Sequence, residues 1–148
     1  TADEADKMCA PVVDEICSRL GDVVYGTDMN SIEERVVALL KEKGKKIATA
    51  ESCTAGYIPK RLTDIPGASE VFECGIVSYS NDIKTKLLGV SPKTLETYGA
   101  VSEQTAREMA LGAKHVSGAD IAISTTGLAG PGGDGRRAHS RRKDSHRS

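Results

Sequence analysis

The chain has 148 residues, 39% of them hydrophobic, which is enough for the core of one domain but not of two. Its 20 basic and 21 acidic residues leave a formal net charge of -1, so the whole molecule has no general attraction for nucleic acids or anionic membranes. Aromatic residues make up only 3%, which argues against base stacking with single-stranded nucleic acid. The charge is uneven, because the segment 136–148 contains six basic residues and one acidic residue.

The cysteines and the lack of long apolar runs indicate the cellular compartment. The four cysteines show neither C-x-x-C spacing nor nearby histidines, so nothing in the sequence signals a zinc site or a redox motif. No apolar run reaches the roughly 18 residues that a membrane span needs, and Thr1 opens an acidic stretch rather than a basic signal region. We expect a cytoplasmic protein with reduced thiols, no metal or other cofactor, and no membrane partner.

An amphipathic helix is predicted over Asp6–Leu20. Its apolar side chains recur every four residues and therefore lie on one face, at Met8, Val12, Ile16 and Leu20. A short apolar run, Val23–Tyr25, and a linker follow. Ser31 and Glu34 then form a capping-box pattern, which predicts a helix that stops at Gly44 in the left-handed conformation.

After this helix, short apolar runs alternate with helical patterns. Three runs are predicted as buried strands, over Ile47–Ala50, Gly75–Tyr79 and Ile121–Thr125. Helices are predicted over Thr54–Leu62, Asn81–Leu88 and Pro92–Tyr98, and from Ser102 to about Val116. Pro59 is expected to kink the first of these helices or to shift its start. The alternation is typical of right-handed crossovers, so we expect an α/β fold with a mostly parallel sheet covered by helices, in a three-layer α/β/α arrangement.

Ser52 follows the first predicted strand, at the edge of the sheet where open α/β folds bind their ligands. The N–H groups of Thr54, Ala55 and Gly56, with the positive end of the next helix, would favour an oxyanion or a phosphate there. Ser52 is therefore a candidate nucleophile. The alternatives are that Ser52 or Thr54 only caps the helix, or that Cys53 is the nucleophile.

A nucleophilic serine needs a base, and Lys84 is the best-placed candidate. It lies in the first turn of the helix after the second strand, where the dipole and partial burial would lower its pKa towards a neutral amine. Tyr79, at the end of that strand, could donate or relay a proton. The alternatives are an ordinary solvated lysine and a tyrosine that packs at the surface. His115 lies far along the chain from any strand end.

The glycine-rich segment Gly127–Gly133 follows the third strand directly. Glycines let a backbone approach an anionic ligand closely. The segment matches neither G-x-x-x-x-G-K-[ST] nor a G-x-G-x-x-G that opens a helix, so by itself it is a weak signal for phosphate binding.

Six segments of the chain together resemble one family. They are Ala48–Gly56, Arg61–Ser69, Val77–Asn81 with Lys84, Leu88–Val90, Tyr98–Ser102 and Thr126–Gly133, in this order. The pattern resembles the C-terminal domain of the competence/damage-inducible protein CinA, over roughly residues 31–134. The resemblance implies an amidohydrolase that converts nicotinamide mononucleotide to nicotinate mononucleotide and ammonia in pyridine nucleotide salvage. It also implies a Ser–Lys mechanism without a metal.

The resemblance implies a role for each matching residue. Ser52 would be the nucleophile, Lys84 the base, and Tyr79 their hydrogen-bonding partner. Thr126 and Gly127 would contact the reacting amide or nearby substrate. Further substrate contacts are expected from Thr54, Gly56 and Asn81, and from Gly130 and Gly132 in the loop that approaches the ribose phosphate.

The resemblance also divides the chain. Residues 1–28 look like the end of a preceding domain and a linker, residues 29–135 like the amidohydrolase domain, and residues 136–148 like a disordered basic tail. The family continues past about Asp134 with further strands and a late arginine, so we expect a sheet that is incomplete at its C-terminal side. Two alternatives stay open, a fragment that binds a nucleotide phosphate without turnover and an interaction protein whose tail binds RNA.

An incomplete sheet leaves an unpaired edge next to its third strand. A partner chain could cover this edge, so we expect a homo-oligomer. The other expected partner is the small-molecule substrate, nicotinamide mononucleotide, and nucleic acid is not an expected partner.

Overall fold

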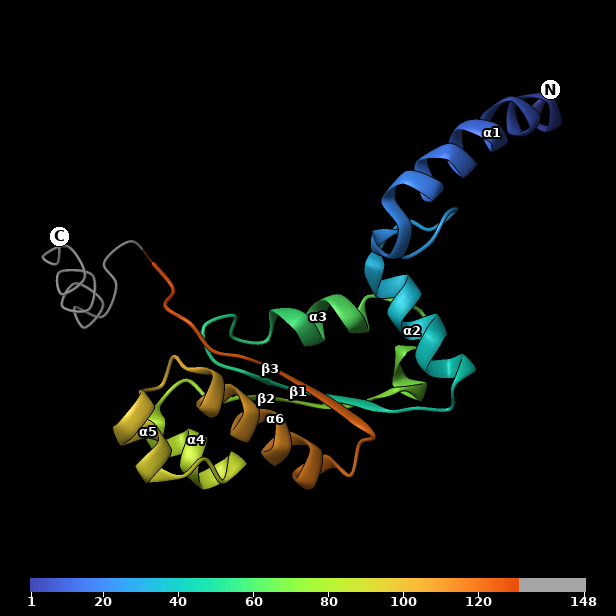
Figure 1. Cartoon of the computed structure of the whole chain (residues 1–148). Helices are drawn as coiled ribbons and strands as arrows, with labels where there is room; N and C mark the ends of the chain where they lie inside the picture. The colour runs from blue at the N-terminus through green and yellow to red at the C-terminus, as the bar shows by residue number, and fades with distance from the viewer. Residues whose placement is uncertain (131–148) are drawn as a thin grey trace, which may run out of the picture.

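The computed structural model describes residues 1–130, which form one three-stranded sheet with helices on both of its faces (Figure 1). In chain order the elements are α1 (Ala2–Leu20), η1 (Gly21–Val23), α2 (Ile32–Glu42), β1 (Ile47–Glu51), α3 (Tyr57–Thr63), η2 (Ala68–Glu70), β2 (Phe72–Val77), α4 (Asn81–Leu88), α5 (Pro92–Tyr98), α6 (Glu103–Ser117) and β3 (Ile121–Thr125). The η elements are single turns of 3-10 helix.

The sheet is parallel, with the strand order β2-β1-β3. Thr49 in β1 pairs with Gly75 in β2 and with Ile123 in β3. Because β1 is the central strand, all five of its residues are buried, whereas β2 and β3 alternate with more exposed positions. The predicted parallel α/β fold is confirmed, and β3 lies at an unpaired edge within residues 1–130, as expected.

Alternating side chains of β1 build two cores. Ala48 and Ala50 pack on one face with a cluster from α4 and α6 and the segments beside them, formed by Leu88, Val90, Met109, Ala113 and Ala119. Ile47 packs on the other face with a cluster formed by Val37, Leu40, Leu62, Ala68 and Val71. Figure 1 shows α3 on one side of the sheet and α4, α5 and α6 on the other. The three-layer arrangement follows from the two-residue period of the central strand.

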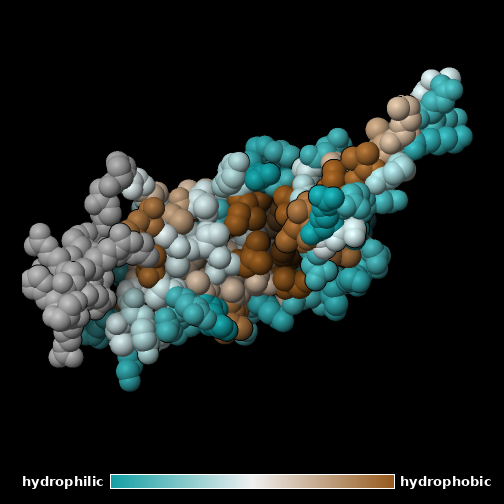
Figure 2. Space-filling model, turned by 45° about the horizontal axis from the view of Figure 1, so that its top comes forward, coloured by the Kyte–Doolittle hydropathy of each residue, from teal (hydrophilic) through white to brown (hydrophobic). Residues whose placement is uncertain are grey.

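Helix α1 projects away from the sheet and has no buried residue (Figure 1). It starts at Ala2, earlier than predicted, because Thr1 and Glu4 form a capping box at the first turn. Its predicted apolar face is exposed, and Figure 2 shows hydrophobic side chains on the surface along this helix and across the middle of the visible face. Within the described part of the chain, no helix has the length and apolar character to cross a membrane.

Several element boundaries differ from the prediction. Strand β2 covers Phe72–Val77 instead of Gly75–Tyr79, because its pairing with β1 already starts at Phe72. The Ser78 N–H makes the last backbone hydrogen bond to β1, to the carbonyl oxygen of Glu51. Helix α3 starts at Tyr57 rather than Thr54, which places Pro59 in its first turn, where no N–H is required. The shift that Pro59 predicted is confirmed.

The cap of α2 is only half of the predicted capping box. The Ser31 side chain accepts a hydrogen bond from the Glu34 backbone N–H, as predicted. The Glu34 carboxylate bonds to the backbone and side chain of Asn30, one residue before the cap. Gly44 takes the left-handed conformation predicted at the end of this helix, with φ of 57°.

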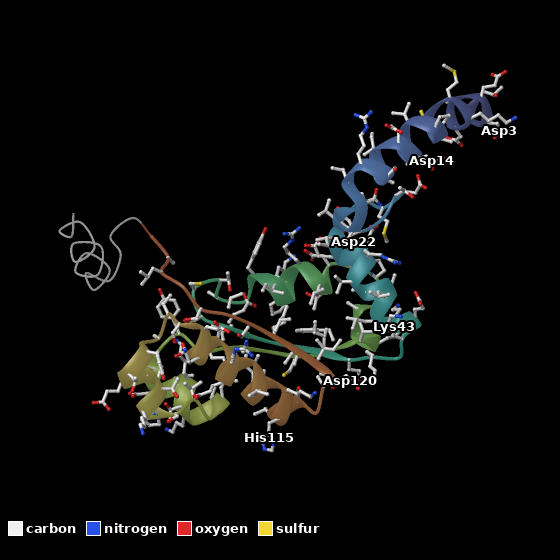
Figure 3. The ribbon with its side chains drawn as sticks, in the orientation of Figure 1. Asp3, Asp14, Asp22, Lys43, His115 and Asp120 are labelled. Atoms are coloured by element: carbon white, nitrogen blue, oxygen red, sulfur yellow. The ribbon has the colours of Figure 1, made fainter. Side chains whose placement is uncertain are left out.

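Asp120, directly before β3, bonds to the residues directly before β1, at the end of the sheet opposite to the predicted site. Its carboxylate accepts hydrogen bonds from the Lys46 backbone N–H at 2.9 Å and from the Lys45 ammonium at 3.0 Å. These two contacts lower the pKa of Asp120. Figure 3 shows Asp120 and His115 near the start of β3, away from the C-terminal ends of the strands.

Gly112 in α6 sets how closely α4 and α6 approach each other. A Cβ atom at this position would lie 2.0 Å from the carbonyl oxygen of Leu88. We expect Gly112→Ala to lower the free energy of unfolding by about 1–3 kcal/mol, because overpacking against backbone outweighs the roughly 1 kcal/mol of helix propensity that alanine adds. Urea denaturation measures the change.

Leu111→Ala is the matched control, because Leu111 lies in the same helix and is 67% exposed. It should change stability by less than about 0.5 kcal/mol. A Gly112→Ala variant as stable as the parent would contradict the close approach of the two helices.

Candidate active site

A cavity of about 590 Å³ lies at the carboxyl ends of the strands. Ser52 comes to it from the end of β1, Lys84 from α4, and Thr126 with Gly127 from the segment after β3. Tyr79 and Asn81 line it as well. Three segments that are far apart in the sequence meet here because parallel strands end at the same edge of the sheet.

Lys84 is the most deeply buried charged residue of this cavity, with 1% of its surface exposed. Its Nζ lies 3.0 Å from Ser52 Oγ, 2.8 Å from the carbonyl oxygen of Ser78 and 3.2 Å from that of Tyr79. Each of these oxygens can accept a hydrogen bond from the ammonium. The structure therefore brings together the two residues predicted as nucleophile and base, which are 32 positions apart in the sequence.

Burial lowers the pKa of Lys84 below its ordinary value of 10.5, because the charged form loses hydration. Cys53 lies close enough to oppose this pKa shift when its thiol is ionised, but its effect is the smaller one. The acceptors around Nζ are neutral carbonyl and hydroxyl groups rather than a carboxylate. The neutral amine form of Lys84 is therefore more favoured here than it would be for a lysine exposed at the protein surface.

Ser52 lies in a turn between β1 and the next helix, as predicted, but this helix starts at Tyr57 rather than at Thr54. The turn runs from Ser52 to Gly56, and Ala55 and Gly56 both have positive φ angles, of 50° and 96°. The Ser52 N–H donates to the carbonyl oxygen of Thr125 at 3.0 Å, which ties the turn to the end of β3. Ser52 is buried and precedes the first residue of α3 by five positions, so it does not cap that helix.

Of the three backbone N–H groups expected to be free after Ser52, those of Thr54, Ala55 and Gly56, the expectation is wrong for Ala55. The Ala55 N–H donates to the carbonyl oxygen of Ser52 at 3.3 Å, because the chain closes a turn there. The N–H groups of Cys53, Thr54 and Gly56 form no hydrogen bond with residues 1–130. These groups, rather than a helix terminus, are the backbone donors available beside the serine.

Tyr79 lines the cavity, but within residues 1–130 its side chain forms no hydrogen bond with Ser52 or Lys84. Its contact with Lys84 is made by the backbone carbonyl, and 69% of the residue is exposed. The chain leaves the sheet after Ser78, which turns the tyrosine ring outward at the rim. Any role of the phenol would concern a bound molecule rather than the apo Ser52–Lys84 pair.

Thr126 and Gly127 lie in the cavity wall, as expected. The Thr126 hydroxyl donates to the carbonyl oxygen of Ala100 at 2.6 Å and so joins this wall to the connection between α5 and α6. A Cβ atom on Gly127 would lie 3.1 Å from the Cys53 sulfur. The absence of a side chain at Gly127 lets the two loops approach closely.

The remaining predicted substrate contacts are less direct. Thr54 bonds through its hydroxyl to that of Thr125, with the oxygens 2.7 Å apart, and it does not line the cavity. Gly56 and Gly130 do not line it either. Gly132 and the basic tail at 136–148 lie outside the described residues.

The sequence did not predict one whole wall of the cavity, the segment from Leu95 to Val101. Its residues up to Tyr98 are the end of α5, and the rest connects α5 to α6. Because the segment does not follow a strand, the expectation that ligands bind beyond strand ends could not identify it. The hydroxyls of Ser102 and Thr105 donate to the carbonyl oxygen of Gly99 and hold this segment in place. The sequence identified Ser102 as a helix cap and Tyr98–Ser102 as one of the segments that resemble the family, but it assigned neither to the site.

No group of three or more His, Cys, Asp or Glu side chains gathers within residues 1–130 in a way that could hold a metal ion. His115 is exposed on α6 and lies away from the cavity (Figure 3).

The fold and the cavity define a parallel α/β protein in which a buried lysine and a serine meet at the carboxyl edge of the sheet. The family model of the CinA C-terminal domain matches residues 29–139, and the chain belongs to this family. The family resemblance of the sequence is thus confirmed.

Relatives and solved structures agree with this assignment. A CinA-like protein of Desulfovibrio desulfuricans is 51% identical over 132 residues, which are 89% of this chain and 31% of that protein. A putative competence-damage inducible protein of Clostridium perfringens is 53% identical over 131 residues, 88% of this chain and 32% of the relative. The crystal structure of a competence/damage inducible protein from Agrobacterium tumefaciens superposes with a TM-score of 0.67 at 45% identity, over 73% of this chain and 68% of that one. The chain spans about a third of the length of the curated relatives it matches.

The lowered pKa of Lys84 predicts how stability depends on pH. Between the folded pKa and 10.5 the unfolded chain binds a proton that the folded chain has lost, so the parent should gain stability relative to Lys84→Met as the pH rises. The slope of the difference is at most about 1.4 kcal/mol per pH unit. Urea denaturation of both proteins from about pH 7 to pH 10.5 measures it.

Lys86→Met provides the matched control, because Lys86 is an exposed lysine of the same helix. Its stability difference from the parent should not change with pH in this way. Parallel stability curves for Lys84→Met and the parent would show that Lys84 keeps an ordinary pKa.

Proposed function

We propose that the protein is a serine–lysine amidohydrolase. The observation that carries the proposal is the 3.0 Å distance between Lys84 Nζ and Ser52 Oγ, inside a cavity and with the lysine buried. A serine hydroxyl is a weak nucleophile until an adjacent base removes its proton, and a desolvated lysine can serve as that base. The substrate we propose is nicotinamide mononucleotide, from the family resemblance of the sequence.

The hydrogen bonds around Nζ suit a neutral amine. A neutral amine has two N–H donors and one lone pair. The carbonyl oxygens of Ser78 and Tyr79, at 2.8 and 3.2 Å, can accept the two N–H bonds. The lone pair is then directed to Ser52 Oγ, whose hydroxyl becomes the donor. This arrangement is the one that proton transfer from serine to lysine requires.

The proposed reaction has two halves. Ser52 Oγ attacks the carboxamide carbon while Lys84 takes the hydroxyl proton, and a tetrahedral oxyanion forms. Lys84 returns the proton to the leaving nitrogen, so that ammonia departs and an ester links Ser52 to the acyl group. Water then attacks the ester carbon while Lys84 takes a proton from it. The bond between the acyl carbon and Ser52 Oγ breaks as Lys84 returns this proton to the serine, so that the acid product leaves and the serine hydroxyl is restored.

The backbone around Ser52 supplies candidate donors for the oxyanion. The N–H groups of Cys53 and Thr54 form no hydrogen bonds with the described residues, and Gly127 brings the opposite loop close to Cys53. We propose that Thr126 and Gly127 contact the amide end of the substrate. Tyr79 and Asn81, on the cavity wall, are the proposed contacts for the rest of it.

Removing either member of the pair should abolish turnover. We expect Ser52→Ala and Lys84→Met to lower ammonia release from nicotinamide mononucleotide by about 10³-fold or more, because one loses the nucleophile and the other the base. A coupled assay for ammonia measures the rates. Circular dichroism and urea denaturation of each variant establish that it is folded.

Two matched controls separate chemistry from general damage. Lys86→Met and Ser69→Ala replace exposed residues of the same types and should keep rates within about 2-fold of the parent. A Ser52→Ala variant that retains activity would contradict the proposal. So would a folded parent that is stabilised by the nucleotide but releases no ammonia, and this result would favour the alternative of a nucleotide-phosphate-binding fragment.

The pH dependence of the rate tests which form of Lys84 acts. Because burial lowers its pKa below 10.5 and the neutral amine is the proposed base, kcat/KM should rise with pH and level off with a midpoint below 10.5. Initial rates measured between about pH 6 and pH 10 define this rise of kcat/KM with pH. A rate that falls as the pH rises through this range, in protein that stays folded, would show that the ammonium form is required.

A further inference from the structure

Glu51 is the last residue of β1 and directly precedes Ser52, yet it does not line the cavity. It is fully buried on the face of the sheet that α3 covers. Its Oε2 accepts a hydrogen bond from the backbone N–H of Ile58 at 3.3 Å, and its Oε1 has no partner in the described part of the chain. A buried carboxyl group with a single hydrogen bond costs stability. Stability therefore does not explain its presence there.

The contact between Glu51 and Ile58 closes the turn that carries Ser52. Ile58 is the second residue of α3, so the hydrogen bond spans the whole segment from the end of β1 to the start of the helix. Inside this segment Ala55 has a φ of 50°, a conformation in which the alanine Cβ crowds the backbone. Contacts around such a turn have to hold it in shape.

The other side of the turn is held by β3. The Ser52 N–H donates to the carbonyl oxygen of Thr125, and the hydroxyls of Thr54 and Thr125 share a hydrogen bond. These contacts fix the first half of the turn. The Glu51 carboxylate acts on the second half, because Ile58 belongs to the helix that follows.

We propose that Glu51 is a positioning residue of the Ser52–Lys84 pair. Its carboxylate holds the start of α3 against β1, and this fixes the turn that presents the serine hydroxyl to the lysine amine. The inference rests on the proposed function. Glu51 does not itself contact the reacting groups, because α3 and α4 lie on opposite faces of the sheet (Figure 1).

The test compares two substitutions that differ in one property. Glu51→Gln keeps the side-chain length and an oxygen that can accept the Ile58 N–H, whereas Glu51→Met keeps the length and loses the acceptor. Thr49→Val is the matched control, because Thr49 is buried in the same strand on the same face and its hydroxyl has no partner within residues 1–130.

Two rates are measured for each protein. The first is ammonia release from nicotinamide mononucleotide, separated into kcat and KM. The second is the rate at which a fluorophosphonate probe labels Ser52, followed by mass spectrometry of the labelled peptide. The second rate reports how well the serine is presented and activated, whatever the natural substrate is.

Glu51→Met should lower kcat and the labelling rate about 10- to 100-fold with KM within about 2-fold, because small displacements of a nucleophile cost rates of this order. Glu51→Gln should stay within about 3-fold of the parent on both rates, and Thr49→Val should match the parent. If Glu51→Met does not fold, Glu51→Asp takes its place, since the shorter side chain cannot reach Ile58 and the same losses are expected.

Unchanged rates in Glu51→Met would overturn the inference, as would equal losses in Glu51→Gln and Glu51→Met. A parent in which the probe does not label Ser52 would overturn it as well. A parent that is labelled at Ser52 but releases no ammonia would contradict the proposed function alone. The labelling rates of the variants would then decide the role of Glu51.

Discussion

A lysine side chain buried at the end of a sheet needs acceptors for its N–H groups, and Lys84 finds two in backbone carbonyls and a third in the Ser52 hydroxyl. The carbonyls belong to Ser78 and Tyr79, at the exit of β2. Their positions depend on the last hydrogen bond between the strands, from the Ser78 N–H to the carbonyl oxygen of Glu51. The lysine is thus held by the same backbone that ends β1 and presents the serine.

This dependence gives the short strand β1 a double task. It is the central strand, so its five residues are buried and its alternate side chains support both cores. The end of β1 also determines where the chain leaves the sheet after β2 and β3, because both strands pair with β1 in parallel register up to its last residue. The cavity lies where these three exits meet, and the segment from Leu95 to Val101 adds a further wall to it.

The two sides of the sheet make different contributions to the site. The face with α4 and α6 supplies Lys84 and most of the cavity wall. The face with α3 supplies the buried Glu51 and the start of the helix that closes the Ser52 turn. The family assignment covers both faces, since the match extends from residue 29 past β3. Helix α1 lies before this match and adds no buried residue.

Much of this protein was determined by its sequence alone. The alternation of apolar runs and capped helices predicted the parallel α/β fold, and strong local signals such as Pro92 after Ser91 set helix ends to the residue. The sequence also singled out Ser52 and Lys84, because both follow strands. Tertiary structure decided the rest, since it depends on contacts between distant segments: the 3.0 Å approach of the pair, the outward turn of Tyr79, the wall from Leu95 to Val101 and the burial of Glu51. Local patterns specify where a strand ends, but only the packed sheet specifies which side chains meet there.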